Sequence, residues 1–162
     1  ARYHNIFGPE GTWKGGREKA PAAICRKVAY VPPSGGSVEV WGDGKQTRSF
    51  LYIDECIEAT RRLMDSNFQG PVNIGSEEMV TIDELVDITA RVANKVVTKV
   101  YDLSAPRGVM GRNSNNDLIK QELKWDYEQS LEEGIRKTYG WIAWEISKEI
   151  YSEENTTSMN IN

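Results

Sequence analysis

The chain has 162 residues, of which 39% are apolar and 27% are charged, and its formal net charge is −4. This is the composition of an ordinary globular protein that can bury a core, and no run approaches the roughly 20 apolar residues that cross a bilayer. Residues 1–30 hold six cations against two anions, which favours a small anionic ligand, or a solvated basic loop, over nucleic acid. Because no basic and apolar leader is present, we expect a cytoplasmic protein away from membranes.

The first third of the chain predicts a short strand, a helix and then two more strands. A strand-like run over 3–7 comes first and leads into a glycine-rich loop. A helical pattern over 22–29 begins just after a proline, which the first turn of a helix tolerates. Two candidate strands follow, over 38–41 and 49–53. The residues between them contain Asp43-Gly44, a turn signal, although their number exceeds a tight hairpin.

Further along, strands and helices continue to alternate. Asp54 is a candidate N-cap for a helix over 55–66. Short strands are expected at 72–75 and at 98–103. Strands that alternate with helices predict an α/β fold.

Two helix starts carry the strongest local signals. Thr81 with Glu84, and Ser130 with Glu133, match the capping box, in which each side chain satisfies a free backbone N–H of the first turn. Apolar residues recur at helical spacing after both. The helix after Ser130 places these residues on one face: Leu131, Ile135, Thr138, Ile142, Ile146 and Ile150.

Four blocks of sequence carry a resemblance to a known family. They lie at 5–21, 41–56, 72–85 and 108–125, and their order and wording resemble the GDP-mannose 3,5-epimerases, NAD-dependent enzymes of the extended short-chain dehydrogenase/reductase type. Weaker forms of the blocks occur across the nucleotide-sugar epimerases and dehydratases.

This resemblance implies the C-terminal, substrate-binding half of that α/β fold, without most of the Rossmann sheet. We expect residues 1–151 to form the nucleotide-sugar domain, with the last part of the Rossmann domain at its N-terminus, and 152–162 to form a polar, disordered tail. The chain begins inside an apparent strand, so we expect a fragment, or a cassette whose partner is another polypeptide.

The resemblance also implies site residues, and their chemistry suits the roles. Lys19 is the expected acid/base, because inverting a carbon beside a ketone needs a proton donor and an acceptor on opposite faces; an exposed surface lysine is the alternative. Arginine presents a planar fork that matches phosphate oxygens. The expected substrate contacts are Asn5, Glu18, Ala20, Lys27, Gln46, Thr47, Arg48 and Arg112. A loop-bracing role is the alternative for Asn5, and a solvent-exposed side chain is the alternative for Lys27, Arg48 and Arg112.

Other reactive side chains are interpreted as structural. Cys25 and Cys56 have no metal-site spacing and are expected to be small buried side chains, and His4 has no partner for a metal. No metal site is therefore predicted.

The sequence lacks the parts that handle the cofactor. The glycines of 8–16 do not have dinucleotide-fingerprint spacing, and no tyrosine is followed four residues later by lysine. NAD is implied for the full-length family, but we expect none to bind this chain alone, and we expect the chain alone to be inactive.

We therefore predict the nucleotide-sugar-binding part of a GDP-mannose 3,5-epimerase-like enzyme. Two alternatives stay open: a stand-alone, non-catalytic binding or assembly module, and a fragment that acts on a UDP-sugar. A partial sheet would expose apolar surface, so we expect a homo-oligomer or pairing with an NAD-binding half, and no nucleic-acid or membrane partner.

Overall fold

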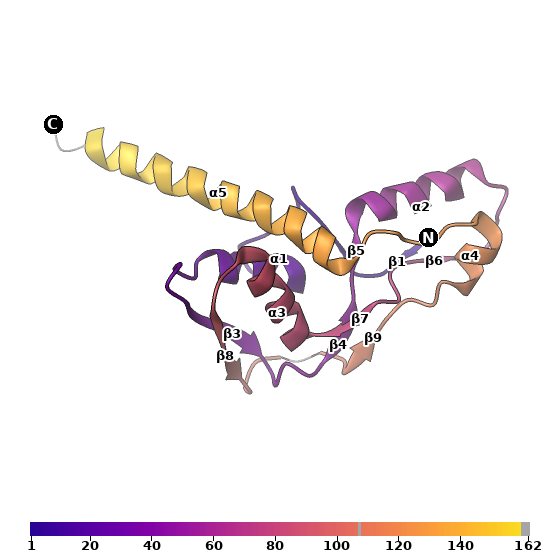
Figure 1. The fold of residues 1–162 in the computed structure, drawn as a ribbon. Helices are drawn as coiled ribbons and strands as arrows, with labels where there is room; N and C mark the ends of the chain where they lie inside the picture. The colour runs from indigo at the N-terminus through magenta and orange to yellow at the C-terminus, as the bar shows by residue number, and fades with distance from the viewer. Residues whose placement is uncertain (107, 160–162) are drawn as a thin grey trace.

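The computed structural model describes residues 1–106 and 108–159 of the chain. Its short strands and its helices alternate along the sequence, which confirms the predicted α/β class (Figure 1). The helices are α1 (Ala20–Ala29), α2 (Ile53–Asp65), α3 (Ile82–Ala93), α4 (Asp117–Leu123) and α5 (Leu131–Met159). The strands are β1 (Arg2–Tyr3), β2 (Ile6–Phe7), β3 (Gly36–Trp41), β4 (Thr47–Ser49), β5 (Leu51–Tyr52), β6 (Asn73–Ile74), β7 (Met79–Thr81), β8 (Val97–Asp102) and β9 (Gly111–Arg112).

The strands form small separate sheets. β1 pairs with β6, β2 with β5 and β3 with β8, all in parallel. β4 lies between β7, to which it is antiparallel, and β9, to which it is parallel. The candidate strands at 38–41 and 49–53 therefore do not form a hairpin, because each finds its partners elsewhere in the chain.

Two apolar clusters support this arrangement. In the larger, α1, α3 and α5 pack on one another and on β3, with Val28, Leu85 and Ile135 fully buried (Figure 1). In the smaller, α2 and α4 cover β6, and Ile74 and Ile119 are fully buried. Loss of this apolar surface from water is the main favourable term in folding.

Local signals place the helix starts as expected in two cases. At α3, the Thr81 hydroxyl accepts a hydrogen bond from the Glu84 N–H, and the Glu84 carboxylate accepts one from the Thr81 N–H at 2.7 Å. At α5, Ser130 and Glu133 make the same reciprocal pair. Both predicted capping boxes are confirmed.

Two local predictions are wrong. The strand expected over 3–7 is split into β1 and β2, because Asn5 adopts a left-handed conformation with φ of 47°. Asp54 is not an N-cap, since α2 begins at Ile53 and its N-cap residue is Tyr52. Asp54 lies in the first turn of that helix, where a negative charge also favours the helix dipole.

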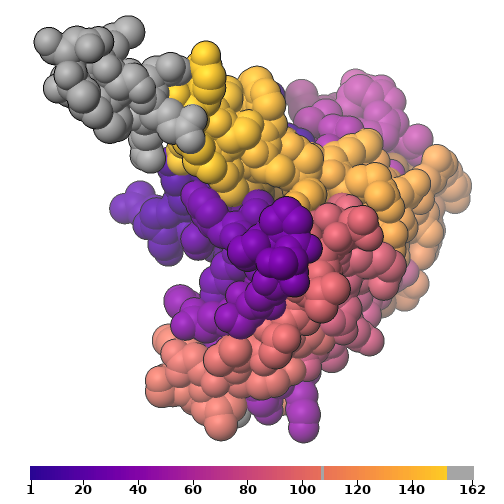
Figure 2. Space-filling view, turned by 60° about the vertical axis from the view of Figure 1, so that its left-hand side comes forward, coloured from indigo at the N-terminus to yellow at the C-terminus, as the bar shows by residue number. Residues whose placement is uncertain are grey.

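Helix α5 is the longest element and runs beyond the rest of the molecule (Figures 1 and 2). Its backbone is helical over 152–159, where the sequence predicted a polar tail, and 160–162 lie outside the described residues. The division into 1–151 and 152–162 stays a prediction. Within the described residues, no helix is both long and apolar enough to span a membrane.

Candidate functional site

A cavity of about 770 Å³ lies among α1, β3, β4 and the glycine-rich loop that precedes α1. A volume of this size is typical of small-molecule sites. Most of the site residues expected from the sequence line this one cavity: Asn5, Glu18, Lys19, Ala20, Lys27, Gln46 and Arg48. Thr47 and Arg112 are not among the lining residues.

Glu18 holds the glycine-rich loop against the N-terminal end of α1. One of its carboxylate oxygens accepts a hydrogen bond from the Arg26 guanidinium at 2.7 Å, and the other accepts one from the Gly16 N–H at 2.7 Å. Arg26 also donates to the Trp13 carbonyl at 3.0 Å. A hydrogen bond from its own backbone N–H, followed by the Arg26 contact, holds the pKa of Glu18 below its usual value in spite of burial. Glu18 therefore stays ionised and ties the loop to the helix.

Lys19 occupies the N-cap position of α1, with extended backbone angles of φ −77° and ψ 161°. Its side chain is exposed on the cavity wall and makes no hydrogen bond or ion pair with any described residue. The neighbouring Lys14 differs, because it pairs with Glu149 of α5 and lies over the Trp13 ring. Lys19 thus offers the cavity an ammonium group that is not bound to the protein.

Lys27 is held by β3. Its ammonium donates to the carbonyl oxygen of Glu39 at 2.9 Å and to the Glu39 carboxylate at 3.1 Å. The Trp41 ring lies 5.9 Å from the same ammonium. Lys27 therefore links α1 to β3 at the cavity, and its contact with the carboxylate is the largest cause of the lowered pKa of Glu39.

Gln46 is the most buried of the expected site residues, with 5% of its surface exposed. Its amide nitrogen donates to the Trp41 carbonyl at 2.9 Å, whereas its amide oxygen is buried without a partner among the described residues. A buried acceptor without a donor is costly, so this oxygen is a point of unsatisfied polarity beside the cavity.

Two other expected contacts lie on β4 and just before β2. Arg48 is half-buried, and its guanidinium donates to the adjacent Thr47 carbonyl at 2.7 Å. Asn5 donates from its side-chain amide to the Ser49 carbonyl at 2.9 Å, while its own carbonyl accepts from the Leu51 N–H. Asn5 thus joins the start of β2 to the β4–β5 segment at the wall of the cavity.

Arg112 reaches the site only through strand pairing. It lies on β9 directly opposite Arg48 on β4, and in a parallel pair such partners point to the same face of the sheet. The Arg112 side chain is exposed and makes no hydrogen bond or ion pair with a described residue. The two arginine side chains therefore leave the sheet from adjacent backbone positions on one face, beside the cavity that Arg48 lines.

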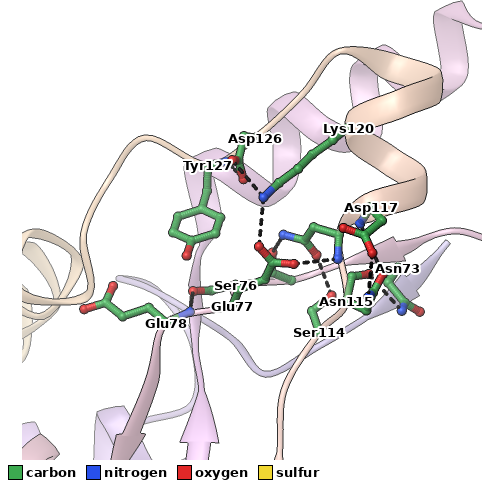
Figure 3. A network of polar contacts seen from close by, with 12 residues as sticks. Asn73, Ser76, Glu77, Glu78, Ser114, Asn115, Asp117, Lys120, Asp126 and Tyr127 are labelled. Atoms are coloured by element: carbon green, nitrogen blue, oxygen red, sulfur yellow. Dashed lines mark hydrogen bonds and ion pairs between the residues drawn. The ribbon is translucent and has the colours of Figure 1, made fainter.

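A polar network that sequence reasoning missed holds the segment after Arg112 (Figure 3). Glu77 accepts from the Asn116 N–H at 2.9 Å and from the Lys120 ammonium at 2.8 Å, and Lys120 also pairs with Asp126 at 3.0 Å. The Lys120 ammonium is the largest cause that lowers the pKa of Glu77.

At the centre of this network, Asn116 is fully buried. Its amide nitrogen donates to the Gly75 carbonyl at 2.8 Å, and its amide oxygen accepts from the Ser114 hydroxyl at 2.6 Å. These contacts attach the chain just after β9 to the loop after β6. In the sequence, the only signal for these hydrogen bonds is the run of polar residues over 113–117.

The cysteines take the structural role expected of them. Both are buried and unpaired, and burial raises the pKa of the Cys25 thiol to about 12. Within the described residues, no group of three His, Cys, Asp or Glu side chains could hold a metal ion.

Comparison with known proteins agrees with the motifs. Residues 1–75 match the model of the NAD dependent epimerase/dehydratase family. Over 148 residues the chain is 52% identical to the GDP-mannose 3,5-epimerase of Arabidopsis thaliana and 51% identical to GDP-mannose 3,5-epimerase 1 of Oryza sativa subsp. japonica, in each case over 91% of this chain. The chain belongs to the NAD dependent epimerase/dehydratase family. It spans 38% of the length of these two relatives.

Solved structures of nucleotide-sugar epimerases share the fold. The UDP-glucose 4-epimerase of Thermotoga maritima, solved with UDP-glucose, matches 90% of this chain and 45% of its own with a TM-score of 0.79 at 24% identity. A UDP-glucuronic acid 4-epimerase variant from Bacillus cereus matches 87% of this chain and 43% of its own with a TM-score of 0.75 at 26% identity. The predicted part of an extended short-chain dehydrogenase/reductase fold is thereby confirmed.

Proposed function

We propose that this chain is the nucleotide-sugar-binding part of a GDP-mannose 3,5-epimerase-like enzyme. One observation carries the proposal: residues from separate sequence blocks converge on a single cavity, whose wall presents Lys19 without a protein partner. The relatives at 52% and 51% identity are GDP-mannose 3,5-epimerases. Together these favour a GDP-sugar as the ligand.

In this proposal Lys19 moves one proton. Epimerisation beside a ketone removes a proton from carbon on one face of the sugar and returns a proton on the other face. The ammonium of Lys19 would donate on its face, and the opposite group would come from outside this chain. Glu18 would act through position, because its bonds to Arg26 and Gly16 fix the loop that carries Lys19.

Arg48 and Arg112 would bind the diphosphate. This proposal is supported by the register of β4 and β9, in which Arg48 and Arg112 are direct partners and so begin from adjacent positions. A diphosphate has enough oxygen atoms to accept hydrogen bonds from both guanidinium groups at once.

The residues of this chain do not fit NAD. The loop from Gly8 to Lys19 is far longer than the tight turn in which a dinucleotide fingerprint places the pyrophosphate on a helix N-terminus. When bound in the full-length family, NAD supplies hydride transfer. In this proposal the hydride-transfer step belongs to a part of the enzyme outside this chain. Turnover of GDP-mannose by the purified chain alone would contradict it.

Titration calorimetry with GDP-mannose and UDP-glucose tests the proposal. We expect Arg48→Ala to weaken GDP-mannose binding by about tenfold or more, because it removes a charged hydrogen-bond donor. Lys19→Met should change binding much less, because its role is in proton transfer.

Arg17→Ala is the matched control. Arg17 carries the same charge, is exposed in the loop before α1 and does not line the cavity. Absence of binding to either nucleotide sugar, or an equal loss for Arg17→Ala and Arg48→Ala, would argue against the proposed site. Binding to UDP-glucose alone would favour the UDP-sugar alternative.

The proposed partner is either a second copy of this chain or a protein that supplies the NAD-binding half. Exposed apolar side chains on the protruding helix, including Trp144 and Tyr151, support an association. Light scattering across a concentration series should show a rising mass. A constant monomer mass, together with GDP-mannose binding, would instead support the stand-alone binding module.

A further inference from the structure

The glycine-rich loop before α1 is attached to the rest of the protein at two places. At its C-terminal end, Glu18 and Arg26 tie it to α1. Between the two attachments lie Gly15 and Gly16, whose φ angles of 91° and 85° are in the left-handed region that favours glycine. Nothing lies within 4 Å of a Cβ added at either position. Packing of these two residues therefore does not hold the loop, and its course depends on its attachments.

The other attachment is to helix α5. The Trp13 side chain is buried, with 8% of its surface exposed, and belongs to the apolar cluster that contains Ile142 and Ile146. The Lys14 ammonium pairs with the Glu149 carboxylate and lies 4.8 Å from the centre of the Trp13 ring. These contacts attach the loop to α5 just before its two central glycines.

Helical spacing explains why Glu149 meets the loop. Ile142, Ile146 and Glu149 follow one another at intervals of four and three residues, so they lie on one face of α5. Ile142 and Ile146 are buried in the cluster, and Glu149 continues the same face about two turns beyond Ile142. Figure 2 shows the indigo segment near the start of the chain against the yellow helix. The protruding helix therefore has a direct contact with the loop.

This contact bears on the site because the loop forms part of the cavity wall. Lining residues from this region are Lys14, Gly15, Gly16, Glu18 and Lys19. The Lys19 side chain bonds to none of the described residues, so the backbone that carries it sets its position. Glu149 is not among the lining residues, so its short-range effect on a ligand must pass through the loop.

We propose that Glu149 is a positioning residue of the ligand site. It holds Lys14, which covers Trp13, and so fixes the part of the cavity wall that leads to Lys19. The inference rests on the proposed function for the nature of the ligand. It goes further because it gives a role at the site to α5, which lies outside the four sequence blocks.

The test combines tryptic cleavage of the loop, followed by mass spectrometry, with titration calorimetry. Cleavage after Arg17 reports opening of the loop, because Arg17 is exposed and lies between the two attachments. An exposed ion pair shifts such an equilibrium by up to about fivefold. We expect Glu149→Gln to speed this cleavage by about two- to fivefold, while the melting temperature changes by less than about 2 °C.

GDP-mannose binding to Glu149→Gln is the second measurement. Its affinity should fall by about two- to fivefold, because the ligand must then order the loop that the ion pair no longer holds.

A charge exchange distinguishes this specific contact from a general loss of packing. Lys14→Glu and Glu149→Lys should each speed cleavage after Arg17. The double variant restores an opposite pair in the reverse order, and its cleavage rate should return to within about twofold of the unaltered chain. Binding is compared only for the Glu149→Gln variant, because Lys14 itself lines the cavity.

Glu145→Gln is the matched control. Glu145 lies on the same helix, is half-buried like Glu149, and pairs with Lys148 rather than with the loop. Removing the same charge there should leave both the cleavage rate and the GDP-mannose affinity unchanged.

The outcomes separate this inference from the proposed function. A cleavage rate that Glu149→Gln leaves unchanged, or a double variant cleaved as fast as the single variants, overturns the role of Glu149 in holding the loop. Faster cleavage with unchanged GDP-mannose affinity overturns its role at the site, while nucleotide-sugar binding stands. Failure of the unaltered chain to bind any nucleotide sugar overturns the proposed function, and the cleavage rates then decide by themselves whether α5 holds the loop.

Discussion

Replacing Asn116 by alanine should destabilise the protein strongly. The side chain is fully buried, and its removal leaves the Gly75 carbonyl and the Ser114 hydroxyl without their partners. An unsatisfied buried group costs about 1–3 kcal/mol, so the two together predict a loss of about 3 kcal/mol. For a chain of this size that corresponds to a fall in melting temperature of about 6–12 °C.

Circular dichroism melts and urea titrations would measure this loss. Asn113→Ala is the control, because Asn113 is the same residue type in the same segment but is exposed. Its effect should stay within about 0.5 kcal/mol. If Asn116→Ala melted like Asn113→Ala, the argument that this hydrogen-bond network holds the segment after Arg112 would be wrong.

Three further predictions concern stability and reactivity. Gly140→Ala should stabilise α5 by about 0.5–1 kcal/mol, because nothing lies within 4 Å of an added methyl group. Gly134→Ala, in the same helix, should destabilise it, since that methyl would meet a buried aromatic ring at 2.7 Å; urea unfolding of both variants checks the sign. With a pKa of about 12, the Cys25 thiol should react with a thiol reagent at pH 8 only when the protein unfolds, and rapid reaction of the native protein would contradict its burial. Thr81→Ala should cost about 1 kcal/mol through the lost N-cap, and Glu84→Gln, which removes the titrating group, should make stability less dependent on acid. The folded pKa of Glu84 is lowered chiefly by the Thr81 N–H, so its contribution is present above the usual pKa of 4.5 and is lost as pH falls through the folded value. An unchanged acid limb in the Glu84→Gln melts would refute that link.

The sequence by itself determined the features that depend on nearby residues or on motifs shared with a family. Both capping boxes follow from side chains that reach backbone groups within one helical turn, so spacing alone was sufficient to find them. The α/β class follows from the alternation of short strands with helical patterns. The motif blocks identified the family and supplied most of the residues that line the cavity.

Only the tertiary structure decided how these elements pair and which polar groups remain available. Asn5 interrupts the first strand because β1 and β2 pair with different strands far away in sequence. Gln46 and Asn116 are polar residues whose burial depends on segments that fold over them, and local pattern carries no record of that burial. Hydrogen bonds between residues distant in sequence also distinguish Lys27, which bonds to Glu39, from Lys19, whose side chain bonds to none of the described residues. The sequence therefore determined the family and the helices. The three-dimensional contacts decided which charged side chains are bound by other residues of the protein and which are not.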